Sequence, residues 1–115
     1  MNTEIDRKIA VILVADVVGY SKHMEKDENA TIKNYSACEK ILNNLLKKYK
    51  GSVFNTGGDS VLVEFPSAVN AVECGVAFQN DIKKRNASDK TGVKLEFRLV
   101  KMVIVMIGIY VELRK

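Results

Sequence analysis

Residues 9–16 read IAVILVAD, a run of seven apolar residues that ends at Asp16. Charged residues precede the run, so the pattern predicts a central strand over Ile9–Ala15 that is covered on both faces. The small and turn-prone residues 17–21, VVGYS, follow it. A carboxylate at the end of a buried strand, next to such a turn, offers a hard oxygen ligand beside a pocket of phosphate size.

A second carboxylate stands in a tight turn further along the chain. Residues 55–60 read NTGGDS, between short strands predicted over Ser52–Thr56 and Ser60–Phe65. The glycines allow the backbone angles of a hairpin turn, so Asp59 would lie at a strand end and could share metal ions with Asp16. Each aspartate also has a purely structural interpretation, as a helix cap or strand-end charge for Asp16 and as a turn residue for Asp59.

Two helices are predicted from residues that recur at three- and four-residue steps. The first runs from Glu28 to about Lys50 and stops at Gly51; the second runs over 68–86 with Ser67 as its N-cap. The expected buried residues of the first helix are Ile32, Tyr35, Cys38, Ile41, Leu42, Leu45, Leu46 and Tyr49. Those of the second are Val69, Val72, Val76, Phe78 and Ile82.

A further strand is predicted over Lys94–Arg98. The apolar segment Leu99–Val111 is shorter than the roughly 20 residues that a membrane-spanning helix needs, so it is interpreted as a buried strand or strand pair with a bend near Gly108. The resulting order is strand, helix, strand, strand, helix, strand. It predicts the α+β fold class, with a ferredoxin-like antiparallel sheet and helices on one face.

Composition narrows the class of protein. A chain of 115 residues with 47% apolar content forms at most one domain with an ordinary core. The net charge of +4 includes a cluster at 83–85, interpreted as a solvated helix end rather than a nucleic-acid patch because no aromatic residues interleave. Cys38 and Cys74 suit a reducing compartment, and the polar start of the chain lacks secretory features, so a cytoplasmic location without a membrane span is predicted.

Two segments carry a resemblance to a known family. The stretches ADVVGYS at 15–21 and TGGDSVLVEFPSA at 56–68 resemble the class III nucleotidyl cyclase (adenylate/guanylate cyclase) catalytic domain, and the resemblance runs from about Arg7 to Arg98. It implies conversion of ATP or GTP to a 3′,5′-cyclic nucleotide and pyrophosphate by two-metal catalysis, in intracellular signalling. It also implies a homodimer, or a heterodimer with a complete cyclase domain.

The resemblance assigns roles to particular residues. Asp16 and Asp59 would be the catalytic ligands of two Mg²⁺ or Mn²⁺ ions, with the carbonyl of Val17 as a third ligand. Asn55 takes the position at which many family members have a lysine that contacts the base. This leaves the choice between ATP and GTP as substrate open, with ATP favoured. The backbone amides implied to bind the triphosphate are those of Val18, Gly19, Tyr20 and Ser21.

The family pattern fails after Arg98. A glycine-rich stretch, a second base-reading position and an Asn-x-x-x-Arg motif do not follow it. The sequence is therefore interpreted as one partial cyclase domain over 1–115, family-like over 7–98 with an atypical apolar tail over 99–115, truncated or altered after Arg98 and weak or inactive alone.

Two alternatives stay open. The chain could be a non-catalytic nucleotide-binding or dimerisation module with a cyclase fold. The Gly57-Gly58-Asp59 turn also suggests a diguanylate cyclase, although Ser60-Val61 replaces the acidic-aromatic pair expected there.

Overall fold

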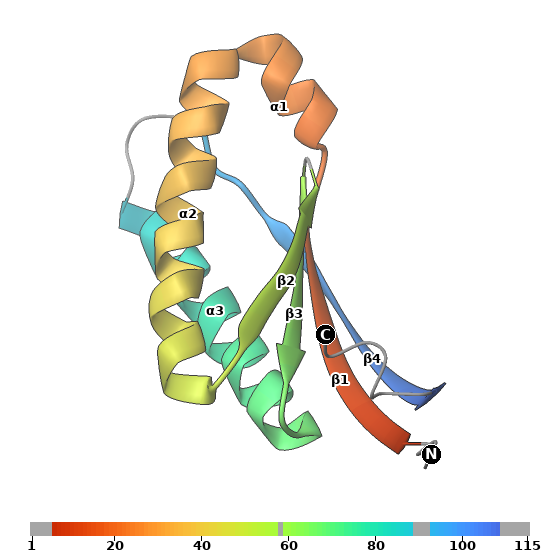
Figure 1. Ribbon diagram of the computed structural model, residues 1–115. Helices are drawn as coiled ribbons and strands as arrows, with labels where there is room; N and C mark the ends of the chain where they lie inside the picture. Colours follow the sequence, from red (N-terminus) through yellow and green to blue (C-terminus); the bar gives the residue numbers. More distant parts are fainter. Residues whose placement is uncertain (1–5, 58, 89–92, 109–115) are drawn as a thin grey trace.

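The computed structural model describes residues 6–57, 59–88 and 93–108. Four strands form one antiparallel sheet in the order β2-β3-β1-β4, and the helices α2 and α3 cover one face of it (Figure 1). This arrangement confirms the predicted α+β, ferredoxin-like class. The elements are β1 (Asp6–Val17), α1 (Tyr20–Lys26), α2 (Glu28–Tyr49), β2 (Ser52–Gly57), β3 (Ser60–Phe65), α3 (Ala68–Ser88) and β4 (Phe97–Gly108).

Strand β1 is central, as its apolar run predicts, but it is longer than expected at both ends. The prediction that both of its faces are covered is wrong for the described residues, because α2 and α3 lie on the same face of the sheet (Figure 1). It pairs with β3 from Val11 to Asp16 and with β4 along its whole length, from Asp6 opposite Gly108 to Val17 opposite Phe97. Because both edges of β1 are hydrogen-bonded, Asp16 is held inside a ladder rather than on a free strand end.

Strand β4 departs from the prediction. The predicted strand over Lys94–Arg98 begins only at Phe97. It continues to Gly108 as one strand, which agrees with the first of the two interpretations of the apolar segment, a strand, and not with a strand pair. The long partner β1 provides the template for this extension. Residues 109–111, where the predicted bend would continue, lie outside the described residues.

The α1 helix was not among the elements predicted from the sequence. It is separated from α2 by Asp27, whose carboxylate accepts a hydrogen bond from the Ala30 amide at 3.1 Å. Asp27 therefore caps α2, and α2 spans nearly the range predicted for it.

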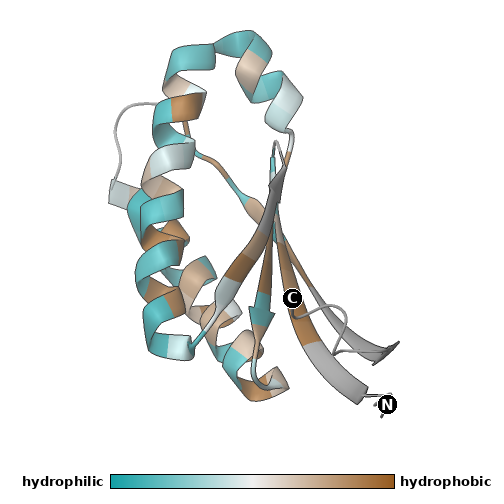
Figure 2. Cartoon of the chain, viewed as in Figure 1, coloured by the Kyte–Doolittle hydropathy of each residue, from teal (hydrophilic) through white to brown (hydrophobic). Residues whose placement is uncertain are grey.

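The core lies between the sheet and the two long helices. Alternate residues of β1, from Val11 to Val17, point toward the helices and are buried. Figure 2 shows apolar residues on the coloured parts of the strands and on much of α3, whereas hydrophilic residues predominate along α1 and α2. The buried cluster includes Leu13, Cys38, Leu42, Leu46, Val61, Val63, Phe65, Ala71, Cys74, Phe78 and Ile82.

The predicted buried face of α3 is wrong at its three valines. Val69, Val72 and Val76 are 62%, 47% and 55% exposed, whereas Phe78 and Ile82 are buried as predicted. The helix packs instead through the small residues Ala71, Cys74 and Gly75, which allow its backbone to approach the sheet closely. Ile32, predicted on the buried face of α2, is likewise exposed.

The start of α3 agrees with the sequence. The hydroxyl of Ser67 accepts a hydrogen bond from the Asn70 amide at 3.1 Å, which confirms the predicted N-cap.

Candidate functional site

The end of β1 and the β2–β3 turn lie side by side. The Val17 amide donates a hydrogen bond to the Asp59 carbonyl at 3.0 Å, and Asp16 lies opposite Ser60 in the β1–β3 register. The two aspartate-bearing segments that the sequence singled out are therefore neighbours, although they are far apart in the chain. Both aspartates are only partly buried, so their carboxylates are accessible to ligands.

Arg98 is a neighbour of Asp16 that sequence reasoning missed. Its Nη2 lies 3.7 Å from Asp16 Oδ2, and the two residues are directly opposite in the β1–β4 register. The Arg98 side chain is 67% exposed, so solvent screens this ion pair and its contribution to stability is small. Only the strand register reveals this contact.

The donor set limits which ions could bind. Within the described residues, no group of three or more His, Cys, Asp and Glu side chains could hold a metal ion. A site here would consist of the Asp16 and Asp59 carboxylates and the Val17 carbonyl, all hard oxygen donors of the kind that Mg²⁺ and Mn²⁺ prefer. These residues fit a divalent ion whose remaining ligands come from phosphate oxygens and water.

A glycine precedes the first turn of α1. Gly19 has φ 65° and ψ 35°, in the left-handed region, and no side chain hydrogen-bonds to the start of the helix. The Gly19 carbonyl accepts from the His23 amide at 3.1 Å, while Tyr20 and Ser21 lie in the first turn, whose amides lack intrahelical acceptors. The Val18 amide was also predicted to bind the triphosphate. In the structure it donates a hydrogen bond to the Glu96 carbonyl at 2.8 Å instead.

Aromatic rings connect this loop to the core. Tyr35 lies between Tyr20 and Phe97, with ring centroids 6.2 Å and 6.4 Å away, and Phe97 contacts Phe78 at 5.0 Å. Burial, followed by the charges of Glu39 and other neighbours that include Asp59, raises the pKa of Tyr35 to about 12. The sequence placed Tyr35 only on the buried side of a helix and did not indicate that it lies near Asp59.

The predicted base-reading residue, Asn55, belongs to β2. Its backbone lies opposite Leu62, which in turn lies opposite Val14 of β1. Strand β3 therefore lies between Asn55 and β1. The contacts of the Asn55 side chain are outside the described part of the structure.

A curated protein matches part of the chain at substantial sequence identity. No protein-family model matches the chain. The curated protein "Putative adenylate cyclase 3" of Rhizobium meliloti (strain 1021) is 48% identical over 83 residues, which cover 71% of this chain and 14% of that protein. The chain therefore spans about one-seventh of the length of this relative.

Solved structures share the fold. The adenylyl cyclase CyaB from P. aeruginosa superimposes with a TM-score of 0.76 at 24% identity, covering 90% of this chain and 60% of that one. The guanylyl cyclase Cya2 gives a TM-score of 0.76 at 22% identity, covering 93% of this chain and 58% of that one.

These findings confirm the resemblance that the sequence motifs carry. The chain has the fold of the solved adenylyl and guanylyl cyclase structures, and 83 of its residues align at 48% identity with a protein described as a putative adenylate cyclase. Among the described residues, none of the helices has the length and apolar character needed to cross a membrane.

Proposed function

We propose that this chain provides the metal-binding and triphosphate-binding part of a nucleotidyl cyclase that makes a 3′,5′-cyclic nucleotide and pyrophosphate. The observation that carries the proposal is the Val17–Asp59 hydrogen bond of 3.0 Å, which brings the two carboxylate-bearing segments together. The uncapped start of α1 lies two residues further along and adds a place for anionic phosphate oxygens.

In this proposal Asp16, Asp59 and the Val17 carbonyl hold two Mg²⁺ or Mn²⁺ ions. When bound, the ions supply positive charge next to the ribose 3′ oxygen and the departing phosphates. The amides at 19–21 orient the triphosphate. The 3′ oxygen then bonds to the α-phosphorus, the bond from that phosphorus to the β-phosphate oxygen breaks, pyrophosphate leaves and the hydroxyl proton passes to solvent.

The other half of the chemistry needs groups from elsewhere. Stabilising the charge at the α-phosphorus calls for an oriented cation, and the 115 residues contain no Asn-x-x-x-Arg motif, which the family resemblance leads us to expect. We therefore propose that turnover requires a second cyclase domain, with the nucleotide between the two. The choice between ATP and GTP stays open, with ATP favoured and Asn55 proposed to contact the base.

Binding measurements test the first half of the proposal. Calorimetry with a non-hydrolysable ATP analogue should show binding that requires Mn²⁺ or Mg²⁺ and disappears with a chelator. Asp16→Asn and Asp59→Asn should each weaken it at least about tenfold, because each removes a charge that two ions share. Glu25→Gln makes the same charge change at an exposed position of α1 and should have little effect. Equal affinities in all three variants would refute the assignment.

A complementation assay tests the second half. The chain is mixed with a complete cyclase domain whose own metal-binding aspartates have been replaced, and cyclic nucleotide formation is measured from ATP and from GTP. Activity in the mixture that depends on Asp16, without activity in either component, supports the proposal. Robust turnover by this chain alone contradicts it.

The alternative function is a nucleotide-binding or dimerisation module without turnover. The Arg98–Asp16 contact favours it, since a cation already neighbours one proposed metal ligand. Metal-dependent binding together with failure in every complementation mixture would support this alternative over the enzyme.

A further inference from the structure

Residues 95–98 connect α3 to the candidate site. The Glu96 carbonyl accepts the hydrogen bond of the Val18 amide at 2.8 Å, and the Arg98 guanidinium lies 3.7 Å from the Asp16 carboxylate. This short segment therefore helps to hold the end of β1 and the loop after it, together with the Val17–Asp59 hydrogen bond.

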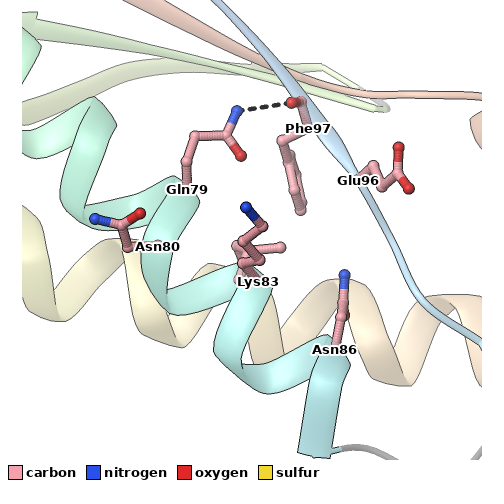
Figure 3. Close-up of a pocket in the computed structure, with 7 residues that line it drawn as sticks. Gln79, Asn80, Lys83, Asn86, Glu96 and Phe97 are labelled. Atoms are coloured by element: carbon pink, nitrogen blue, oxygen red, sulfur yellow. Dashed lines mark hydrogen bonds between the residues drawn. The ribbon is translucent and has the colours of Figure 1, made fainter.

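Two amide side chains of α3 hold the same segment. Gln79 Nε2 donates to the Phe97 carbonyl at 2.8 Å (Figure 3), and Asn86 Nδ2 donates to the Leu95 carbonyl at 2.9 Å. Gln79 and Asn86 are two helical turns apart and so share one side of α3.

The directions of the backbone carbonyls explain why residues 95–97 form hydrogen bonds both toward β1 and toward α3. In an extended chain, successive carbonyls point in opposite directions. Glu96 can therefore face β1 while Leu95 and Phe97 face away from it, along the edge where the described sheet ends. Gln79 and Asn86 occupy acceptors that no further strand pairs with in the described residues.

The packing beside the segment is incomplete. A pocket of about 420 Å³ lies between α3 and the start of β4, and its lining includes both amides, Lys83, Glu96 and Phe97 (Figure 3). Leu95 is fully buried and Phe97 contacts Phe78, but the pocket leaves room on the remaining side. Because apolar contacts alone do not fill this region, the path of residues 95–98 depends more strongly on the hydrogen bonds from Gln79 and Asn86.

We propose that Gln79 and Asn86 are positioning residues for the candidate site. They fix the path of residues 95–98, and through it they hold the Val18 amide and keep Arg98 opposite Asp16. Neither side chain touches the nucleotide in this scheme. The identity of what the site binds rests on the proposed function, whereas the mechanical link to Val18 is independent of it.

The test removes the donors while keeping the shape of the side chains. Gln79→Glu and Asn86→Asp lose the N–H group, and Gln79→Met loses it without adding charge. The control is Asn80→Asp, which makes the same charge change at an exposed residue lining the same pocket. Two quantities are measured: hydrogen exchange at the Val18 amide, with the core residue Leu42 as reference, and Mn²⁺-dependent affinity for the ATP analogue.

We expect the donor-loss variants to speed exchange at Val18 by about tenfold relative to Leu42 and to weaken analogue binding by about fivefold. The control should change neither. The double variant Gln79→Glu/Asn86→Asp should cost less affinity than the two changes added together, since both act on one segment.

Three results overturn the proposal. The first is unchanged exchange at Val18, and the second is acceleration that is equal at Val18 and Leu42, which would indicate only a loss of global stability. The third is faster exchange at Val18 with unaltered analogue affinity. If the unmodified chain binds no analogue with Mn²⁺, the proposed function fails instead, and the exchange measurement still decides whether the amides hold Val18.

Discussion

Arg98 Nη2 lies 3.7 Å from Asp16 Oδ2, because the β1–β4 register places these two residues directly opposite each other. Asp16 is one of the residues proposed to hold the metal ions. A fixed positive charge thus neighbours the carboxylate before any ion binds, and it must repel an incoming divalent cation.

Replacing this arginine should strengthen metal binding. For Arg98→Gln we expect Mn²⁺ affinity to rise about two- to fivefold. The repulsion between a monovalent and a divalent charge about 4 Å apart amounts to roughly 2 kcal/mol in water, and salt and the exposure of Arg98 reduce it. Titration followed by electron paramagnetic resonance measures this affinity. The gain should shrink at high salt, and Lys94→Gln, at an exposed position, should give a smaller gain. A loss of Mn²⁺ affinity in Arg98→Gln would show that the arginine supports the metal site.

Two glycine substitutions should separate loop geometry from general stability. A Cβ at Gly19 would contact nothing within 4 Å, so the cost of Gly19→Ala comes from the left-handed φ of 65°. We expect about 1 kcal/mol of lost stability and weaker triphosphate binding, because the loop must shift.

Gly51→Ala is the matched control for that variant. Its Cβ would lie 2.6 Å from Leu46 Cδ2 and 2.8 Å from Phe65 Cε1, which is too close without repacking. It should destabilise the fold, as measured by urea denaturation, without changing triphosphate affinity per folded molecule. Equal effects on affinity in both variants would contradict a specific role for the Gly19 conformation.

Stability should fall at alkaline pH. Burial raises the pKa of Cys74 from 9.0 to about 11, so the unfolded chain ionises before the folded one. This contribution is complete below about pH 9 and is lost as pH rises toward about 11. Tyr35, whose pKa is raised from 10.0 to about 12 by burial first and then by neighbouring charges, adds a similar loss at higher pH.

Urea denaturation between about pH 8 and pH 10.5 measures this dependence. Cys74→Ala should remove part of the decline below about pH 10.5, and Tyr35→Phe should affect mainly the upper end of the range. The same pH dependence in all three proteins would show that these groups do not cause it.

The exposed valines of α3 should influence association more than stability. Val72 and Val76 are 47% and 55% exposed, so Val72→Gln and Val76→Gln should change the free energy of unfolding by less than about 0.5 kcal/mol. Sedimentation velocity should show less self-association, because the changes reduce an apolar surface patch. Ala71→Gln, at a fully buried position of the same helix, should destabilise strongly. A large loss of stability in the valine variants would place these side chains in the core.

Local patterns in the sequence were sufficient to predict most of the helices and strands. The run at 9–16 predicts the central strand, the glycines at 57–58 predict the hairpin, and Ser67 predicts the start of α3, since each effect acts within a few residues. The proximity of Asp16 and Asp59 was indicated by the family resemblance, and the Val17–Asp59 hydrogen bond supports it.

Choices between equivalent local patterns depend on the tertiary structure. Helix α3 carries two stripes of helical spacing, one with Val69, Val72 and Val76 and one with Ala71, Gly75 and Phe78, and hydrophobicity favours the valines. The small residues were buried instead, because a Cβ at Gly75 would already lie 3.3 Å from Leu99 Cδ1, so the helix lies too close for larger side chains. Likewise, the ion pair of Asp16 with Arg98 and the hydrogen bonds of Gln79 and Asn86 follow from strand register and helix placement. Periodicity describes single elements, whereas register and packing arise only when elements distant in sequence meet.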